Sequence, residues 1–309
     1  MASLKQIKQR IKSVKDTKKV TKTMELISTV NFQKANNLIN HVKEYSDELN
    51  KIRLSLGLDV DSLVRETFES QSRRKLLVIV SSDRGFSGSF LPKIKKFIQL
   101  YIKEKGLADE VILLGKKLVS YLAKLSMTAD EVIYFSSFKN YFNLAEEVFK
   151  LIRSKLEQKQ IGSASVIYTK FESLSNQYVD EMVLFTDSSA GQREKTNSYI
   201  DNAIVEPDRK EVSEYLVNAV LKCNIYLAVV QSVASEHLSR MFAMKKATNA
   251  AQDMIAILQN LYNKTRQDLI TKEIIEVISG MKHSLLSINS SSKGEKDDVL
   301  YKLKLFFNC

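Results

Sequence analysis

Apolar and polar residues follow a helical pattern over long stretches at both ends of the chain. Ser3, a residue type that often caps a helix, precedes Leu4, Ile7, Ile11 and Val14. These apolar residues are three, four and three positions apart, as the seam of a coiled coil requires. The pattern predicts an N-terminal helix that packs along another helix.

The predicted seam continues through Thr17, Thr21, Met24, Ile27, Leu38, Tyr45, Leu49 and Ile52. A matching stripe near the other end runs through Leu227, Val230, Leu238, Met241, Met244, Ala251, Met254, Leu258, Leu261 and Thr265. Small residues between Ala247 and Ala251 favour a close approach of two helices. We therefore expect the two ends of the chain to pair as a long antiparallel coiled coil.

Glycine and proline, which end helices, are absent from the same stretches. Neither occurs from Met1 to Leu56 or from Asp208 to Ser279. Continuous helices over these spans would be on the order of 80 Å and 105 Å long, at about 1.5 Å per residue. Helices of this length cannot lie within the core of a small domain.

The middle of the chain, residues 73–205, has a different pattern. Its short β-rich runs are RKLLVIVSS, DEVILLG, DEVIYFSS and SASVIYTKF, with the helical patterns PKIKKFIQLYIKEKG and NLAEEVFKLIRSKLEQ between the earlier ones. This alternation predicts a central α/β, Rossmann-like domain. The later segment FESLSNQYVDEMVLF predicts a strand, a turn and a second strand, which adds an antiparallel edge to the sheet.

The predicted fold class is therefore α/β, with a long antiparallel coiled coil of N- and C-terminal helices and a central α/β domain. We place an N-terminal coiled-coil helix at 1–57, the central domain at 58–207, a C-terminal coiled-coil helix at 208–280 and an extension at 281–309.

Composition favours a chain that does not span a membrane. It is 44% apolar, we find no apolar run that approaches the roughly 18 residues of a spanning helix, and the N-terminus interleaves lysines with apolar residues instead of resembling a signal peptide. We expect it to stay in the cytoplasm.

The net charge of +11 is concentrated near the N-terminus, where eight lysines and arginines in residues 1–22 face only Asp16. Such an excess admits a nucleic-acid-binding coiled coil as one hypothesis.

Motifs for catalysis or cofactor binding are missing. GxxxxGK[ST] does not occur, and Gly85 and Gly88 in SSDRGFSGSF do not form GxGxxG, so this segment reads as a strand-to-helix turn that needs glycine. The three histidines have no HExxH spacing, and Cys223 and Cys309 lie in no Cys/His cluster. We predict no cofactor and no metal, and a chain that is not an enzyme by itself.

Several segments resemble the γ subunit of F-type ATP synthases. They are IKQRIKSVKDTKKVTKTMELIS, SSDRGFSGSF, EPD at 206–208, ASEHLSRMFAMKKATNAAQDMI and LYNKTRQDLITKEIIEVISG. The match covers nearly the whole chain in the same order. It implies a coiled-coil axle inside a hexamer of α and β subunits, and a central foot domain beside ε and the membrane c-ring.

The resemblance also implies roles for individual residues. Met24 and Arg240 match positions where the axle meets the catalytic ring, and Gln267, Thr271 and Glu273 match ring contacts higher up. Asp83, Arg84 and Gly85 match the foot's SDRG turn, and Glu206 matches a residue near the c-ring loops. The basic N-terminal helix would face acidic β-subunit segments, in place of nucleic acid. Simple coiled-coil packing is the alternative for Met24.

The chain departs from the family in KTMELISTVNF, in SGSFL and in the roughly 29 residues after Gly280. Two hypotheses follow. The chain is the rotor shaft of a proton-coupled ATP synthase, peripheral on the cytoplasmic side of the cell membrane; or it is the shaft of a specialised F1-like ATPase that is not coupled to protons and drives motility or another surface machine, with a substitute for the c-ring.

Overall fold

The computed structural model describes residues 3–58, 60–61, 64, 72–135, 140–174, 176–186, 206 and 208–289, with side chains up to Lys282. The chain divides into a central unit, residues 20–247, and a terminal unit, residues 1–19 and 248–309. Helices α1 (Leu4–Ser55) and α6 (Arg209–Asn289) contribute to both units. Each unit is described by itself.

Helix α1 begins where its sequence predicts. The Gln6 amide donates to Ser3 Oγ at 3.3 Å, and the Ser3 amide donates to Gln6 Oε1 at 3.0 Å. This reciprocal capping box confirms Ser3 as the N-cap. After the helix ends at Ser55, Gly57 has a φ of 64°, the left-handed conformation that commonly closes a helix.

The core of the central unit is a five-stranded sheet of order β3-β2-β1-β4-β5. Its strands are β1 (Lys75–Val80), β2 (Glu110–Leu114), β3 (Glu131–Ile133), β4 (Ser163–Phe171) and β5 (Gln177–Phe185). The first four are mutually parallel, and β5 runs antiparallel to β4 with Lys170 opposite Tyr178. The predicted α/β domain and its antiparallel edge are confirmed.

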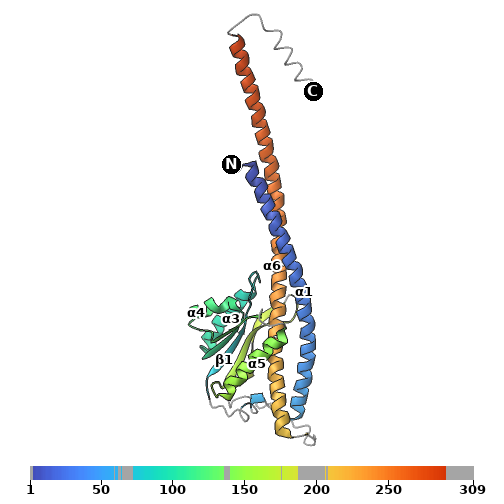
Figure 1. Cartoon of the computed structure of the whole chain (residues 1–309), viewed down its shortest axis with the longest axis vertical. Helices are drawn as coiled ribbons and strands as arrows, with labels where there is room; N and C mark the ends of the chain where they lie inside the picture. Colours follow the sequence, from blue (N-terminus) through green and yellow to red (C-terminus); the bar gives the residue numbers. More distant parts are fainter. Residues whose placement is uncertain are drawn as a thin grey trace. The chain divides into compact units, whose positions relative to one another are not determined.

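Helices cover both faces of this sheet (Figure 1). One face packs on α3 (Phe90–Lys105), η1 (Lys116–Leu118) and α4 (Val119–Lys124). The other packs on α5 (Tyr141–Glu157) and on the parts of α1 and α6 in the central unit. Because successive strand residues point to opposite faces, Leu77 and Ile79 join the first layer, and Leu76 and Val78 join the second.

Within the central unit, the buried seam of α1 differs from the predicted one. Ile27, Tyr45 and Ile52 are exposed, which corrects their assignment to the seam. Thr21 and Leu49 of the predicted seam are buried, and the other buried positions are Ser28, Ala35, Ile39, Val42 and Ser46. Small side chains occupy several of them, since short residues allow helix backbones to approach closely. A search for apolar residues alone misses such positions.

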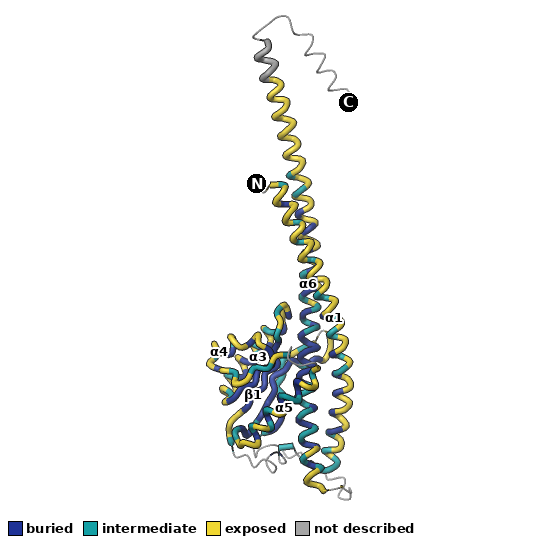
Figure 2. The backbone as a smooth tube through the Cα atoms, viewed as in Figure 1, coloured by how far each residue is buried: buried dark blue, intermediate teal, exposed yellow. Residues whose placement is uncertain are grey.

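The terminal unit pairs residues 4–19 of α1 with the part of α6 that follows Ala247. Ile7 is buried, and Ala251, Ile255 and Leu258 are buried on α6, while Met254 and Leu261 of the predicted stripe are exposed. The Lys18 ammonium donates to the Gln252 side chain across the pair. Beyond Leu258, the described side chains of α6 are almost all exposed (Figure 2).

Helix α6 is the one described helix that meets the length and composition of a membrane span, with an 18-residue window of mean hydropathy 1.5. The expectation that no run approaches this length is therefore wrong. Of that window, 67% is buried within the structure. Ala228, Val229 and Val230 lie in the core shared with the strands and α1, which accounts for buried apolar character in this helix.

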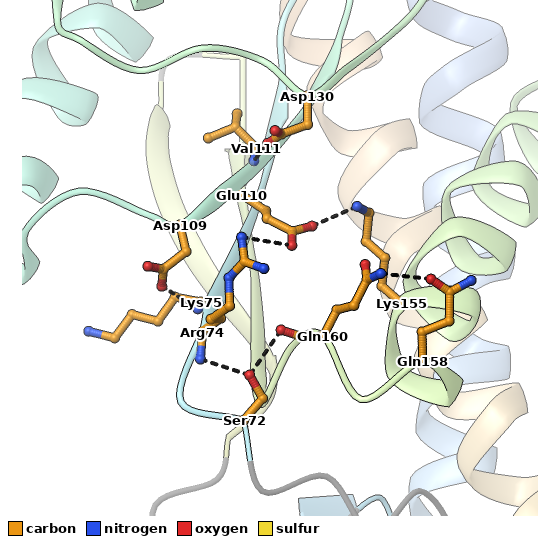
Figure 3. A network of polar contacts seen from close by, with 10 residues as sticks. All are labelled: Ser72, Arg74, Lys75, Asp109, Glu110, Val111, Asp130, Lys155, Gln158 and Gln160. Atoms are coloured by element: carbon orange, nitrogen blue, oxygen red, sulfur yellow. Dashed lines mark hydrogen bonds and ion pairs between the residues drawn. The ribbon is translucent and has the colours of Figure 1, made fainter.

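Polar contacts close the amino edge of the sheet, where β1 and β2 begin (Figure 3). Glu110, only 6% exposed, pairs with Arg74 at 3.2 Å and with Lys155 of α5 at 2.6 Å. Asp130 Oδ2 accepts from the Val111 amide at 2.7 Å. These ion pairs and hydrogen bonds therefore hold α5 and the strand ends together.

The C-terminal helix passes through Gly280 and ends at Asn289, beyond the predicted boundary. The predicted extension thus starts as a continuation of α6, and its remainder, 290–309, lies outside the described residues, as does most of the segment 187–207 before α6.

Candidate functional site: the junction of α6 with the carboxyl edge of the sheet

The turn after β1 approaches α6 closely. Gly88 has a φ of 54°, and a Cβ at this position would lie 3.2 Å from both the Ala243 Cβ and the Ser239 carbonyl oxygen. Gly85, by contrast, has no atom within 4 Å of its would-be Cβ. Of the two glycines in the turn, Gly88 is therefore the one that the packing requires.

A second turn, after β2, supports the first. A Cβ on Gly115, whose φ is 88°, would lie 2.7 Å from the Ser82 carbonyl carbon. The Lys117 amide donates to the Ser82 carbonyl at 3.1 Å, and the Lys116 amide donates to Asp83 Oδ1 at 3.3 Å. The predicted foot residue Asp83 thus joins two turns at the carboxyl edge of the sheet.

An ion pair on α6 anchors these turns. Glu236 and Arg240 are one helical turn apart and are 8% and 7% exposed. The Arg240 guanidinium pairs with the Glu236 carboxylate, which also accepts from the Ser82 hydroxyl at 2.7 Å. Arg240 Nε donates to the Gly85 carbonyl at 3.4 Å. We call these four residues, Ser82, Gly85, Glu236 and Arg240, the α6 clamp.

Burial shifts the pKa values of Glu236 in the clamp and of the neighbouring His237. Burial raises the pKa of the Glu236 carboxyl, and the neighbouring Arg240 charge opposes that rise. Burial, with Arg240 and Arg84 nearby, lowers the pKa of His237 to about 4, so its imidazole is neutral at pH 7. A neutral Nδ1 accepts a hydrogen bond, which suits its 3.3 Å distance from Arg240 Nη1.

Further α6 side chains bond to β4 at the same edge. Ser232 Oγ accepts from the Thr169 amide at 2.9 Å, and Gln231 Oε1 accepts from the Phe171 amide at 3.4 Å. In open α/β sheets, ligands bind at the carboxyl edge where the strand order reverses, which here lies between β1 and β4. Side chains of the chain's own helix fill that position.

The structure brings together residues that the sequence assigned to separate sites. Arg240, a predicted ring contact, meets the turn of Asp83, Arg84 and Gly85, which was predicted for the foot. Arg84 is exposed beside this junction. The contact of Arg240 with a catalytic ring stays a prediction, and its pairing inside the chain is a role that the sequence did not indicate.

The other predicted site residues lie apart from the clamp. Met24 is half-buried on α1, and Glu206 is exposed. Gln267, Thr271 and Glu273 are exposed on α6 in the terminal unit, where Thr271 Oγ1 donates to the Gln267 carbonyl at 2.9 Å. Their surfaces are open to another chain, and their roles stay predictions.

Sequence reasoning missed Ser82, Glu236 and the polar residues that bond to β4. One signal was present: polar residues at 231, 232, 235, 236, 239 and 240 share one face of a helix that is otherwise strongly apolar. A polar stripe at this spacing is equally typical of a solvent-exposed helix face. Only the fold shows that these side chains bond to the sheet instead.

The fold and its clamp define a class of protein, namely a stalk of two antiparallel helices that is fastened to an α/β domain. The family described as ATP synthase matches residues 3–283. The chain is 31% identical to the ATP synthase gamma chain of Leptospira biflexa and 32% identical to that of Pelagibacter ubique. These matches cover 91% of this chain and 98% and 99% of the relatives. The chain belongs to the ATP synthase γ chain family, the central rotor stalk of that enzyme.

Solved structures show the same fold at lower identity. A chain of the Euglena gracilis mitochondrial ATP synthase, in a structure of OSCP, F1 and c-ring, has a TM-score of 0.67 at 17% identity over 95% of this chain and 97% of its own. A chain of the Tetrahymena thermophila central stalk and c-ring has a TM-score of 0.56 at 19% identity over 74% of this chain and 99% of its own. Membership of the family confirms the resemblance drawn from the motifs.

Proposed function

We propose that the chain is the non-catalytic shaft of an F1-type ATPase and transmits rotation between a hexamer of α and β subunits and a partner at its foot. The α6 clamp carries this proposal. Torque passes from a foot domain to a shaft only if the two are rigidly attached, and the buried Glu236–Arg240 pair attaches the sheet's turns to α6.

The ring contact is proposed for the exposed part of α6 in the terminal unit. Gln267, Thr271 and Glu273 lie there among exposed apolar side chains, which are Leu269, Ile270, Ile274, Ile275, Val277, Ile278 and Met281. Apolar residues exposed on all sides of a single helix favour enclosure by another protein. Met24, half-buried on α1, is proposed to face the ring nearer the foot, whereas Arg240 is buried in the clamp.

The shaft couples catalytic sites through differential contacts. One asymmetric helix pair presents a different surface to each of three otherwise identical catalytic subunits, so each rotational position stabilises a different nucleotide state. The exposed lysines of the first helix, including Lys5, Lys8 and Lys15, supply positive charge for acidic segments of the β subunits.

The foot is proposed to bind an ε-like subunit and a c-ring through exposed groups. Arg84 is exposed in the turn after β1, and the neighbouring Phe86 is 71% exposed with a φ of 61°. Glu206 is exposed just before α6. A chain bound in this way is peripheral, on the cytoplasmic side of the cell membrane, and needs no cofactor of its own.

A second candidate is the shaft of a specialised F1-like ATPase that is not coupled to protons and drives a motility or surface machine. One observation favours it: the family match ends at residue 283, and the chain continues to Cys309. In that case a different membrane or surface protein takes the place of the c-ring.

Gentle affinity purification from the native cell, with identification of every partner and an ATPase assay, separates the two candidates. Stoichiometric a, b and c subunits beside α, β, δ and ε are expected for a proton-coupled rotor. Recovery of α- and β-like subunits with other membrane proteins and no c subunit would establish the second candidate. A preparation without α- or β-like subunits would contradict both.

A further inference from the structure

A groove of about 570 Å³ runs between α1, α5 and α6 in the central unit, away from the α6 clamp. Its walls extend from Phe142 to Arg153 on α5 and from Tyr215 to Tyr226 on α6, each about 16 Å at about 1.5 Å per residue. The volume divided by this length is an average cross-section of about 35 Å². The groove is therefore long and narrow.

One end of the groove is apolar and aromatic. Phe142 and Tyr226 meet edge to face with ring centroids 5.7 Å apart, and Leu38 of α1 lies beside them in the lining. Phe142 is 51% exposed, although it is large and apolar. The pair thus forms an open apolar wall with no described segment covering it.

The middle and the other end of the groove carry the polar groups. Arg153 lies near Glu214 at 3.7 Å, in the helical turn of α6 that precedes Asn218, and Tyr215, 75% exposed, lies at the same end. Lys222 is one turn beyond Asn218 toward Tyr226, and its ammonium lies over the Phe149 ring in the middle of the groove. The described lining residues include these two cations and no carboxylate. The groove therefore changes from apolar at Phe142 to cationic at its middle and far end.

The two cations differ in how they are neutralised. Arg153 donates to Glu157 at 2.8 Å and lies near Glu214, so its charge is largely compensated. The Lys222 ammonium lies 5.0 Å from the centre of the Phe149 ring, and no carboxylate of the described residues pairs with it. An aromatic face only partly replaces a counterion, because a cation–π contact at an open site contributes about 0.5–1 kcal/mol.

We infer that this groove binds a small amphiphilic anion, a molecule with a narrow apolar body and one carboxylate or similar group. The apolar body lies between Leu38 and Phe142, and the anion is held by Lys222 with Asn218 one turn away. A volume near 570 Å³ falls within the range of about 300–1,000 Å³ that is typical of small-molecule sites, which often lie between helices.

The distance from Lys222 to the apolar end sets the size of the probe. The Lys222 ammonium lies over Phe149, which is about 10 Å along α5 from Phe142 at about 1.5 Å per residue. An extended alkyl chain advances about 1.3 Å per methylene, from C–C bonds of about 1.5 Å, so about eight carbons cover this distance. Octanoate is therefore the probe, with octanol as the uncharged and octyltrimethylammonium as the cationic analogue. Titration calorimetry on the purified full-length chain, below the aggregation concentration of each probe, measures affinity and stoichiometry.

We expect octanoate to bind once per chain and octanol to bind at least about tenfold more weakly, as for the loss of a hydrogen bond to a charged group. Lys222→Gln is expected to weaken octanoate binding about tenfold, whereas Lys222→Arg keeps the affinity. Lys245→Gln, at an exposed lysine of α6 outside the groove, is the matched control and leaves the affinity unchanged.

A steric variant tests the position of the site. Ala219 lines the groove, so Ala219→Phe fills it and is expected to abolish binding while circular dichroism shows an unchanged helix content. Equal affinity for all three probes, several weak sites per chain, or an unaffected Lys222→Gln would overturn the inference, because each shows adsorption to apolar surface instead of a site for an anion. Any such result leaves the proposed shaft function untouched, since the clamp and the ring contacts lie elsewhere.

Discussion

The Ser82 hydroxyl donates to the Glu236 carboxylate at 2.7 Å and joins the turn after β1 to α6, although the two residues are 154 positions apart in the chain. Both residues are buried, and Arg240 supplies the opposing charge. A buried carboxylate is stable only when it is paired and hydrogen-bonded, so this contact holds the turn and the helix in one arrangement.

Removing the cation of the clamp leaves its anion unpaired. Arg240→Met is expected to lower the free energy of unfolding by about 3–5 kcal/mol, the usual result of breaking a buried ion pair from one side. Urea unfolding of the full-length chain measures it. The double variant Arg240→Met with Glu236→Leu is expected to recover part of the loss, and Lys245→Met on the same helix is the exposed control. An Arg240→Met chain as stable as the wild type would refute the clamp.

The two glycines of the turn after β1 provide a matched pair. Gly88→Ala places a Cβ 3.2 Å from the Ser239 carbonyl oxygen at a φ of 54°, so we expect a loss of about 1–2 kcal/mol, as for a left-handed non-glycine residue. Gly85→Ala meets no atom within 4 Å and is expected to change stability much less. Denaturant midpoints compare the two, and equal effects would contradict the close approach of this turn to α6.

Acid is expected to weaken the fold through His237. Its folded pKa of about 4 lies below the ordinary value of 6.5, so the unfolded chain binds more protons between these values, and stability falls as the pH drops through this window. The raised pKa of Glu236 acts in the opposite sense. Unfolding free energies at pH 4.5 and 7 should differ less in His237→Gln than in the wild type.

A comparable variant separates that effect from general acid destabilisation. His41 is exposed on α1, so His41→Gln should retain the pH dependence of the wild type. If both histidine variants behave alike, the acid sensitivity has another source.

Met24→Lys tests the ring contact. Met24 is only half-buried, so the new charge is expected to change stability by less than about 1 kcal/mol while it impairs rotation and ATPase coupling in the assembled complex. Single-molecule rotation and ATPase assays are the readouts. Normal rotation would leave Met24 as a residue of coiled-coil packing alone.

Removal of the residues after Gly280 tests the C-terminal extension. Helix α6 is exposed on every described side chain between 266 and 282, so truncation there removes no described core contact. We expect the truncated chain to assemble with α and β subunits and to support ATP hydrolysis. Failure of the hexamer to form around it would show that the extension is part of the structure.

Much of this architecture follows from the sequence alone. Long stretches without glycine or proline predict α1 and α6, and the reciprocal Ser3–Gln6 cap begins α1 where the pattern does. Short runs rich in valine and isoleucine predict β1 and β2, because a strand buried on both faces is apolar throughout. These patterns involve residues close together in the sequence, so they can be recognised without knowledge of the fold.

Only the tertiary structure decided which residues are buried. Ile27 and Tyr45 are apolar and exposed, whereas Ser28 and Ala35 are buried, because the approach of α6 and not hydrophobicity selects the seam of α1. Glu236 is charged and yet belongs to the interior, because the fold brings Ser82 and Arg240 to it. The sequence by itself determined the helices, the strands and the family. The clamp depends on partners far apart along the chain, and no local pattern encodes a contact between them.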